Sequence, residues 1–221
     1  MPCATLAPPP GATTIVPSPP PPAGADTGTA VMTVTTNLGV IEVELDRAKT
    51  PCTAAFLGHL GSSGLYRGTT CHRLTTEGIY VLQCGDPAGT GQGGPAFAYA
   101  EEGLPSASPN PGCQGTAGPA GLQPLSPGTR MPAEPCFDRP ERPLMDYGQG
   151  TVAMANGGPG TTGSQFFFVY RDSNFAANFT VLGHVRTGMD IVDGVAQGGT
   201  EDGSGDGRPR SWLSIEAVAV R

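Results

Sequence analysis

Two stretches of the sequence carry polar and aromatic side chains in a pattern typical of amide binding. In the first, Gln83 follows Arg73 after ten residues. In the second, Asn156 ends an apolar run, and Gln165 and Phe167 lie two residues apart, on one face of a strand. A guanidinium, amide groups and aromatic rings on one surface suit a neutral amide substrate with an apolar side chain. Whether Arg73 and Gln83 share a face stays open, because a turn between them leaves their parity undetermined.

The same residues do not suit hydrolysis or metal catalysis. The sequence has no Gly-x-Ser-x-Gly motif, and its three histidines (His59, His72 and His184) are scattered. Its six cysteines lack the Cys-x-x-Cys spacing of a zinc site. We therefore expect no nucleophile–base pair, no metal and no cofactor.

Two glycine-rich runs imitate ligand-binding loops. The run from Gly89 to Gly94 resembles a phosphate cradle but lacks the Lys-Ser/Thr pair that contacts phosphate and Mg²⁺. The run from Asp202 to Gly207 begins like a calcium loop, but its twelfth position is Leu213, where a bidentate Glu is required. We interpret both runs as turns.

Short alternating stretches predict the strands that would hold these residues. Apolar and acidic residues alternate over 41–45, and a turn at 37–39 joins this strand to 32–35 as a hairpin. Further strands are expected near 70–74, 79–83, 151–155, 165–170, 179–185 and 213–216.

Two helices complete the predicted elements. Thr50 and Pro51 are a cap and a first-turn residue for a helix that ends at 61–64, and a second helix is expected near 187–195. Many short strands in mostly antiparallel order, with two helices, predict a mainly β fold: a closed antiparallel β-barrel of about eight strands, capped by two helices.

The composition divides the chain. Residues 1–30 hold nine prolines and few large apolar side chains, so we expect a disordered, semi-extended linker; a proline-rich ligand for an SH3-like partner is the alternative. Residues 31–221 form the predicted domain, in which 85–150 are a loop-rich excursion.

Charge and cysteine content limit partners and location. The net charge of −7 argues against nucleic acid and anionic membranes as partners. No apolar run approaches the roughly 20 residues that cross a bilayer, so we expect a soluble chain. The net charge makes a monomer the default expectation. An even number of cysteines favours an extracytoplasmic protein, secreted or tethered through an N-terminal anchor outside this chain, with the cytoplasm as the alternative.

The motifs resemble those of the cyclophilins, which are peptidyl-prolyl cis–trans isomerases. The resemblance covers about residues 31–221 and is strongest from Met154 to Phe167. His72-Arg73 and Gln83-x-Gly85-Asp86 support it, and their surroundings are similar to a bacterial subgroup that is often exported or membrane-tethered. The resemblance implies a cyclophilin-like barrel and an isomerase.

Matching positions imply the role of each residue. Arg73 matches the catalytic arginine, and Gln83 the glutamine that orients it. The other matches are substrate-binding positions: Tyr80 and Val81 in the proline pocket, Ala155 and Asn156 at the substrate backbone, Gln165 as a polar contact, Phe167 as the pocket floor, and Phe175 and Phe179 where the family has Trp and His. Two extra residues between Arg73 and Tyr80 depart from the usual spacing.

The implied activity is non-covalent isomerisation of X–Pro bonds in proline-containing polypeptides, which assists their folding. Arg73 would donate a hydrogen bond to the prolyl nitrogen. The missing Trp implies weak binding of cyclosporin-type inhibitors. The alternative is a proline-peptide-binding or chaperone-like module with little turnover, against which the retained Arg73 and Gln83 argue.

The resemblance also bears on the cysteines. The family fold makes neighbours of the strands that carry Cys71 and Cys84, so it implies a disulfide there. Cys113 with Cys136 would close the excursion and leave Cys3 and Cys52, and a set of buried thiols is the alternative.

Overall fold

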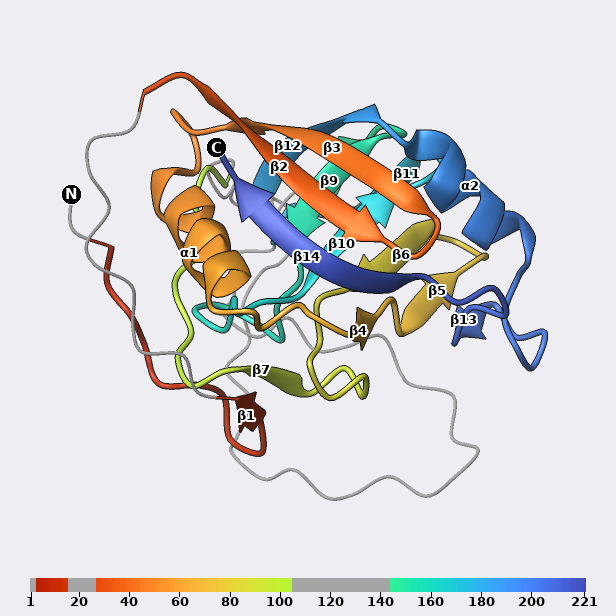
Figure 1. The fold of residues 1–221 in the computed structure, drawn as a ribbon, viewed down its shortest axis with the longest axis horizontal. Helices are drawn as coiled ribbons and strands as arrows, with labels where there is room; N and C mark the ends of the chain where they lie inside the picture. Colours follow the sequence, from red (N-terminus) through yellow and green to blue (C-terminus); the bar gives the residue numbers. More distant parts are fainter. Residues whose placement is uncertain (1–2, 16–26, 105–143) are drawn as a thin grey trace, which may run out of the picture. The chain divides into compact units, whose positions relative to one another are not determined.

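One antiparallel sheet of ten strands organises the residues that the computed structural model describes, which are 3–15, 27–104 and 144–221 (Figure 1). In spatial order the strands are β13 (Asp206–Gly207), β5 (Arg73–Thr75), β6 (Val81–Cys84), β10 (Phe166–Val169), β9 (Thr151–Met154), β12 (Val181–Thr187), β3 (Gly39–Asp46), β2 (Thr29–Thr36), β14 (Ser214–Val220) and β4 (Thr69–Thr70). Only Cys71 and His72 separate β4 from β5, although these strands lie near opposite ends of this order. The sheet is therefore curled, and the predicted mainly β antiparallel fold is confirmed.

The β2–β3 hairpin shows how the sequence pattern forms the sheet. Its register runs from Thr29 opposite Asp46 to Thr36 opposite Gly39, around the turn that was expected at 37–39. The apolar members of the alternation, such as Val34 and Ile41, are fully buried. Burial of one face thus fixes this register, because a slip of one residue would expose every apolar side chain.

The interior of the curled sheet holds the main core. Side chains from neighbouring strands meet there, among them Leu74 of β5, Leu82 of β6, and Phe166 and Phe168 of β10. Because alternate residues of a strand face opposite sides, Phe167 must point outward from this core. The outer face of these strands is therefore available for a site.

The first helix, α1 (Pro51–Ser62), covers part of the sheet beside β14 (Figure 1). Its apolar residues Phe56, Leu57 and Leu60 are buried. A Cβ atom at Gly61 would lie 2.2 Å from the carbonyl oxygen of Val218. The glycine therefore permits the close approach of helix and strand.

The prediction that the side chain of Thr50 caps α1 is wrong. Thr50 precedes the helix, but its hydroxyl donates a hydrogen bond to the carbonyl oxygen of Asp46 (3.0 Å) and does not cap the helix. The carboxylate of Glu102 accepts the N–H groups of Cys52 (3.1 Å) and Thr53 (2.7 Å). The cap comes from a distant residue because the fold brings its negative charge to the positive end of the helix.

The second helix, α2 (Met189–Gln197), lies close to the predicted range and buries Val192 and Val195. The strands that were not expected from the sequence include β7 (Gly93–Pro95), β8 (Leu144–Tyr147) and β11 (Ser173–Ala176), as well as β13. β8 and β11 form a separate antiparallel pair. No helix within 3–15, 27–104 and 144–221 has the length and apolar character needed to cross a membrane.

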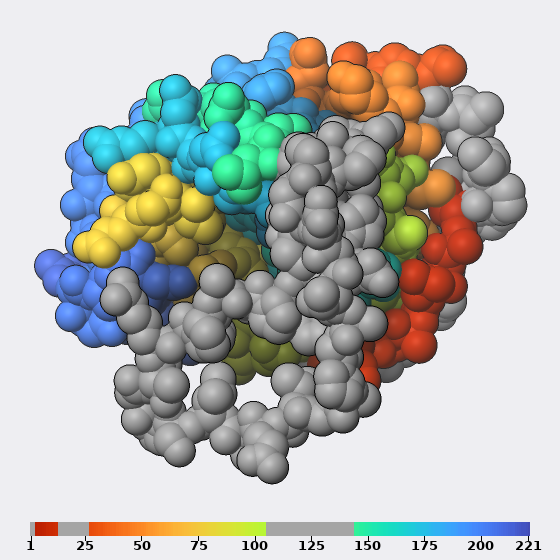
Figure 2. Space-filling model, turned by 180° about the vertical axis from the view of Figure 1, so that it is seen from behind, coloured from red at the N-terminus to blue at the C-terminus, as the bar shows by residue number. Residues whose placement is uncertain are grey.

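The N-terminal residues 3–15 contact the domain at three points. Cys3 forms a disulfide with Cys52 of α1, and Leu6 pairs with Ala98. A short strand, β1 (Thr13–Ile15), runs parallel to β7. Figure 2 shows this segment, in red, against the yellow-green part of the chain.

A second disulfide joins Cys71 to Cys84, the pair that the family resemblance implied. Cys3 and Cys52, which the expected pairings left over, bond to each other. Cys113 and Cys136 lie outside the described residues, as does the larger part of the predicted excursion.

Candidate active site

Three adjacent strands bring the predicted polar and aromatic residues into one row. Arg73 of β5 lies opposite Gln83 of β6, and Gln83 lies opposite Phe167 of β10. Directly paired residues share a face of the sheet, and their sequence neighbours Leu74, Leu82 and Phe166 point into the core on the other face. The parity of Arg73 and Gln83, which the sequence left open, is thereby settled.

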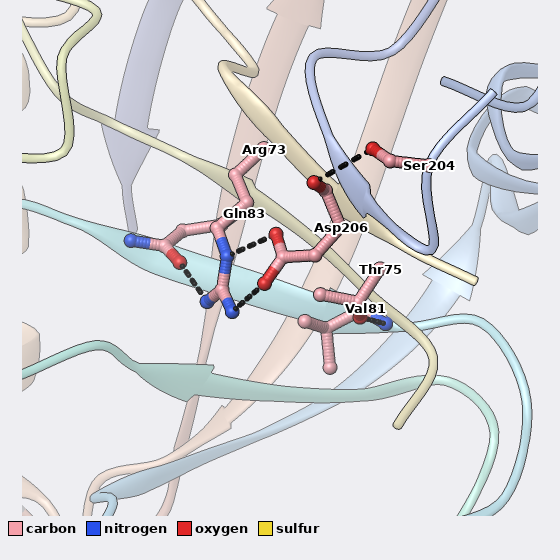
Figure 3. A network of polar contacts seen from close by, with 6 residues as sticks. All are labelled: Arg73, Thr75, Val81, Gln83, Ser204 and Asp206. Carbon is pink, nitrogen blue, oxygen red and sulfur yellow. Dashed lines mark hydrogen bonds and ion pairs between the residues drawn. The ribbon is translucent and has the colours of Figure 1, made fainter. Parts of the chain in front are cut away.

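Arg73 is held by hydrogen bonds from two directions (Figure 3). Its Nη1 donates to Oε1 of Gln83 (3.2 Å), while Nε and Nη2 donate to Oδ1 (2.8 Å) and Oδ2 (2.7 Å) of Asp206. The hydrogen bonds of this pair raise the pKa of Arg73 and lower the pKa of Asp206. The guanidinium therefore stays charged and fixed while its side chain is 41% exposed.

Gln83 continues this network away from Arg73. Its Nε2 donates to Oε1 of Gln165 (2.8 Å), and Nε2 of Gln165 donates to the carbonyl oxygens of Gly91 (3.1 Å) and Gly93 (2.9 Å). Because both ends of each amide are engaged, the oxygen of Gln83 is directed at Arg73. The network thus fixes the guanidinium relative to the sheet.

Asp86 shapes the loop to which Gln165 is bonded. Its buried carboxylate accepts the N–H groups of Ala88 (2.7 Å), Thr90 (2.8 Å) and Gly91. Burial alone would raise the pKa of Asp86, but these N–H groups outweigh it and the pKa is lowered. A Cβ atom at Gly93 would lie 1.8 Å from Oδ1 of Asp86, so only glycine fits there.

An apolar cluster lies on the same outer face as Arg73. Phe167 forms its centre: the ring centroids of Phe175 and Phe179 lie 6.0 and 5.4 Å from its own. Val81 belongs to the cluster, and Tyr147 stacks on Phe175 at 3.9 Å. The cluster offers an apolar surface beside a charged donor.

Tyr80 packs in a different place. Its ring contacts Tyr170, with centroids 5.9 Å apart, and the guanidinium carbon of Arg171 lies 4.7 Å from its centroid. Its assignment to the proline pocket therefore stays a prediction.

Ala155 and Asn156 line a cavity of about 480 Å³, together with Gln165 and Pro8. The N–H of Ala155 donates to the carbonyl oxygen of Gln165 (2.9 Å). The side chain of Asn156 donates to the carbonyl oxygen of Asn178 (2.9 Å). These residues thus lie at the edge of the cavity beside Gln165.

Sequence reasoning missed two residues of this region. Tyr147 lies in the loop-rich stretch 85–150, where no sequence pattern or motif identifies it as a site residue. Asp206 lies in the turn that only imitated a calcium loop, and its acidic character was the available signal. In the described ranges no group of His, Cys, Asp and Glu side chains is placed to hold a metal ion.

Comparison with known proteins agrees with this geometry. The family model of the "Cyclophilin type peptidyl-prolyl cis-trans isomerase/CLD" matches residues 31–220. A probable peptidyl-prolyl cis-trans isomerase B of Mycobacterium tuberculosis is 37% identical over 191 residues, which are 86% of this chain and 54% of that protein. The homologue of Mycobacterium leprae is 36% identical over 197 residues, which are 88% of this chain and 58% of that protein. The chain thus spans little more than half the length of these relatives.

Solved structures show the same fold. A cyclophilin-type isomerase of Cryptosporidium parvum matches 88% of this chain and 98% of its own, with a TM-score of 0.56 and 20% identity. A structure of that protein in the presence of the dipeptide Ala-Pro matches with a TM-score of 0.57 and 20% identity, covering 86% of this chain and 98% of its own. With the family model extending over residues 31–220, the predicted resemblance is confirmed, and the chain belongs to the cyclophilin-type peptidyl-prolyl cis–trans isomerases.

Proposed function

We propose that this chain accelerates cis–trans isomerisation of X–Pro bonds and that Arg73 is its catalytic residue. The observation that carries the proposal is the row of Arg73, Gln83 and Phe167, which places a fixed, charged donor beside an apolar cluster. Amide resonance gives the X–Pro bond a barrier of roughly 18–20 kcal/mol. A hydrogen bond to the prolyl nitrogen lowers this barrier, because the lone pair becomes available when resonance is lost in the twisted state.

The hydrogen bonds of Arg73 leave donors for this task. A guanidinium has five N–H groups. Three of them bond to Gln83 and Asp206, so among the described residues one N–H of Nη1 and one of Nη2 are left for a substrate. A donor that acts mainly on the twisted state binds it better than the planar amide, which is the requirement for a higher rate.

The apolar cluster suits the prolyl ring. Phe167 supplies the floor, and Val81, Phe175 and Phe179 supply apolar walls. Ala155, Asn156 and Gln165 would hold the peptide backbone along the adjoining cavity. A rate gain of about 10⁵ requires roughly 7 kcal/mol, which a charged donor and fixed orientation together can supply.

The substrates we propose are proline-containing polypeptides, whose folding the chain would assist. The similar Cryptosporidium structure in the presence of Ala-Pro supports this class of ligand. Phe175 and Phe179 in place of the Trp and His of the family support weak binding of cyclosporin-type inhibitors.

We further propose that the protein acts as a monomer outside the cytoplasm, secreted or tethered to a membrane. The two disulfides, Cys3–Cys52 and Cys71–Cys84, support an oxidising compartment.

The test is NMR exchange spectroscopy on a short Ala-Pro-containing peptide with the wild-type chain and Arg73→Ala. We expect exchange to slow by roughly 100-fold or more in Arg73→Ala, since loss of one such donor has this effect in other enzymes. Arg186→Ala, which removes an exposed arginine of β12, is the matched control and should retain wild-type exchange. If wild type binds the peptide without accelerating exchange, the chain is a proline-peptide-binding module instead.

A further inference from the structure

The partner of Arg73 on the side away from Gln83 is a carboxylate from a distant part of the chain. Both oxygens of Asp206 accept hydrogen bonds from Arg73, one from Nε at 2.8 Å and one from Nη2 at 2.7 Å (Figure 3). Two parallel hydrogen bonds fix the plane of a guanidinium, whereas a single bond lets it rotate. The orientation of Arg73 therefore depends on Asp206 as well as on Gln83.

The backbone places Asp206 at this position. It lies on β13, opposite Thr75 of β5, and Gly207 lies opposite Leu74. The N–H of Thr76 donates to the carbonyl oxygen of Gly205 (2.8 Å), which extends the pairing by one residue. The carboxylate is thus presented by the strand that borders the strand of Arg73.

The preceding turn is itself held by hydrogen bonds. The hydroxyl of Thr200 donates to the carbonyl oxygen of Ser204 (2.6 Å), and the N–H of Ser204 donates to Oδ1 of Asp202 (3.0 Å). The Ser204 hydroxyl lies 2.9 Å from the carbonyl oxygen of Asp206 (Figure 3). None of these bonds uses the carboxylate of Asp206, which is committed to Arg73.

We propose that Asp206 is a positioning residue for isomerisation, and that its carboxylate holds Arg73 so that the remaining Nη1 and Nη2 protons face the substrate. This inference rests on the proposed function of Arg73. The ion pair is half exposed, with side-chain exposures of 41% for Arg73 and 55% for Asp206. Pairs as exposed as this add little to folding stability. Loss of the carboxylate should therefore reduce turnover while the fold persists.

The experiment compares Asp206→Ala and Asp206→Asn with Asp190→Ala and Asp190→Asn, which change an exposed carboxylate of α2. We expect Asp206→Ala to lower kcat by about 10-fold with little change in KM, because misorientation of a catalytic group affects the reacting state more than ground-state binding. The decrease in kcat should be smaller for Asp206→Asn, since the amide oxygen still accepts one of the two hydrogen bonds. The Asp190 variants should match wild type.

The Nε–H resonance of Arg73 in ¹⁵N NMR spectra tests whether Asp206 holds the guanidinium in solution. Bonded to a carboxylate, this proton should exchange slowly with water, and Asp206→Ala should abolish its protection while the amide spectrum of the sheet is retained. Wild-type or higher kcat in folded Asp206→Ala would overturn the proposal.

A double-mutant cycle separates this inference from the proposed function. If Asp206 acts through Arg73, the change Asp206→Ala should have no further effect in an Arg73→Ala background. Full activity of Arg73→Ala would refute the proposed function itself. Loss of activity in Arg73→Ala together with full activity in Asp206→Ala would refute only the role of Asp206.

Discussion

At the scale of single residues, the site is a chain of hydrogen bonds that crosses three strands. It runs from Asp206 through Arg73 and Gln83 to Gln165 and ends on the backbone carbonyl oxygens of Gly91 and Gly93. Each of these side chains is oriented by a hydrogen bond to the next one, and catalysis by a fixed donor requires such orientation. The disulfide Cys71–Cys84 joins β6, the strand of Gln83, to the residue that lies two positions before Arg73.

His72, between Cys71 and Arg73, makes stability depend on pH. Burial lowers its pKa below the ordinary value of 6.5, although the charge of Asp86 acts in the opposite direction. Because the unfolded chain binds a proton more readily, stability should be complete above about pH 6.5 and decrease as the pH falls toward the lowered pKa. We expect urea unfolding at pH 7.5 and 5.5 to show a smaller decrease for His72→Gln than for wild type. His184→Gln, at an exposed histidine of β12, should behave like wild type, and an unchanged pH dependence in His72→Gln would contradict the argument.

At the scale of elements, α1 depends on the carboxylate of Glu102, which lies 50 residues beyond Cys52 in the first turn of the helix. Glu102 accepts the N–H groups of Cys52 and Thr53 and the hydroxyl of Thr53 (2.7 Å). Glu102→Ala should lower the free energy of unfolding by about 1–2 kcal/mol, because it removes a cap and a negative charge from the helix N-terminus. Urea denaturation measures this loss. Glu216→Ala, which changes an exposed glutamate of β14, is the control. An equal free energy of unfolding for Glu102→Ala and Glu216→Ala would refute the role of Glu102 as a cap.

The elements also show which parts of the fold the sequence predicts. Where alternation is strong, as in the hairpin around 37–39, both strands and faces follow from the pattern, because one face must be buried. That Arg73 and Gln83 lie side by side depends on the register between β5 and β6. This register does not follow from the sequence, because a turn separates the two strands. The cap by Glu102 and the bonds of Asp206 are contacts between distant segments with no local signature. Phe175 and Phe179 were placed by family resemblance, and both contact Phe167.

At the scale of the whole molecule, residues 3–15 are tied to the domain by pairing with β7 and by the Cys3–Cys52 disulfide. The disulfide closes a loop with a sequence separation of 49 residues. In the chain-entropy view, a cross-link of this length restricts the unfolded chain and stabilises the folded state by up to about 4 kcal/mol. The stability of the molecule therefore depends on a segment that precedes β2, the first strand of the ten-stranded sheet along the sequence.

Replacing both cysteines, Cys3→Ser with Cys52→Ser, should lower the free energy of unfolding by a few kcal/mol, within that limit of about 4 kcal/mol. Isomerisation of a short peptide should persist, because Arg73 is held through Gln83 and Asp206, on strands that do not pair with the N-terminal segment. Urea unfolding and NMR exchange on the same samples measure the two quantities, with dithiothreitol-treated wild type to show the effect of reducing Cys3–Cys52 and Cys71–Cys84 together. Unchanged stability would show that the N-terminal disulfide is energetically neutral. Lost activity in a folded variant would show that the site depends on the N-terminal segment.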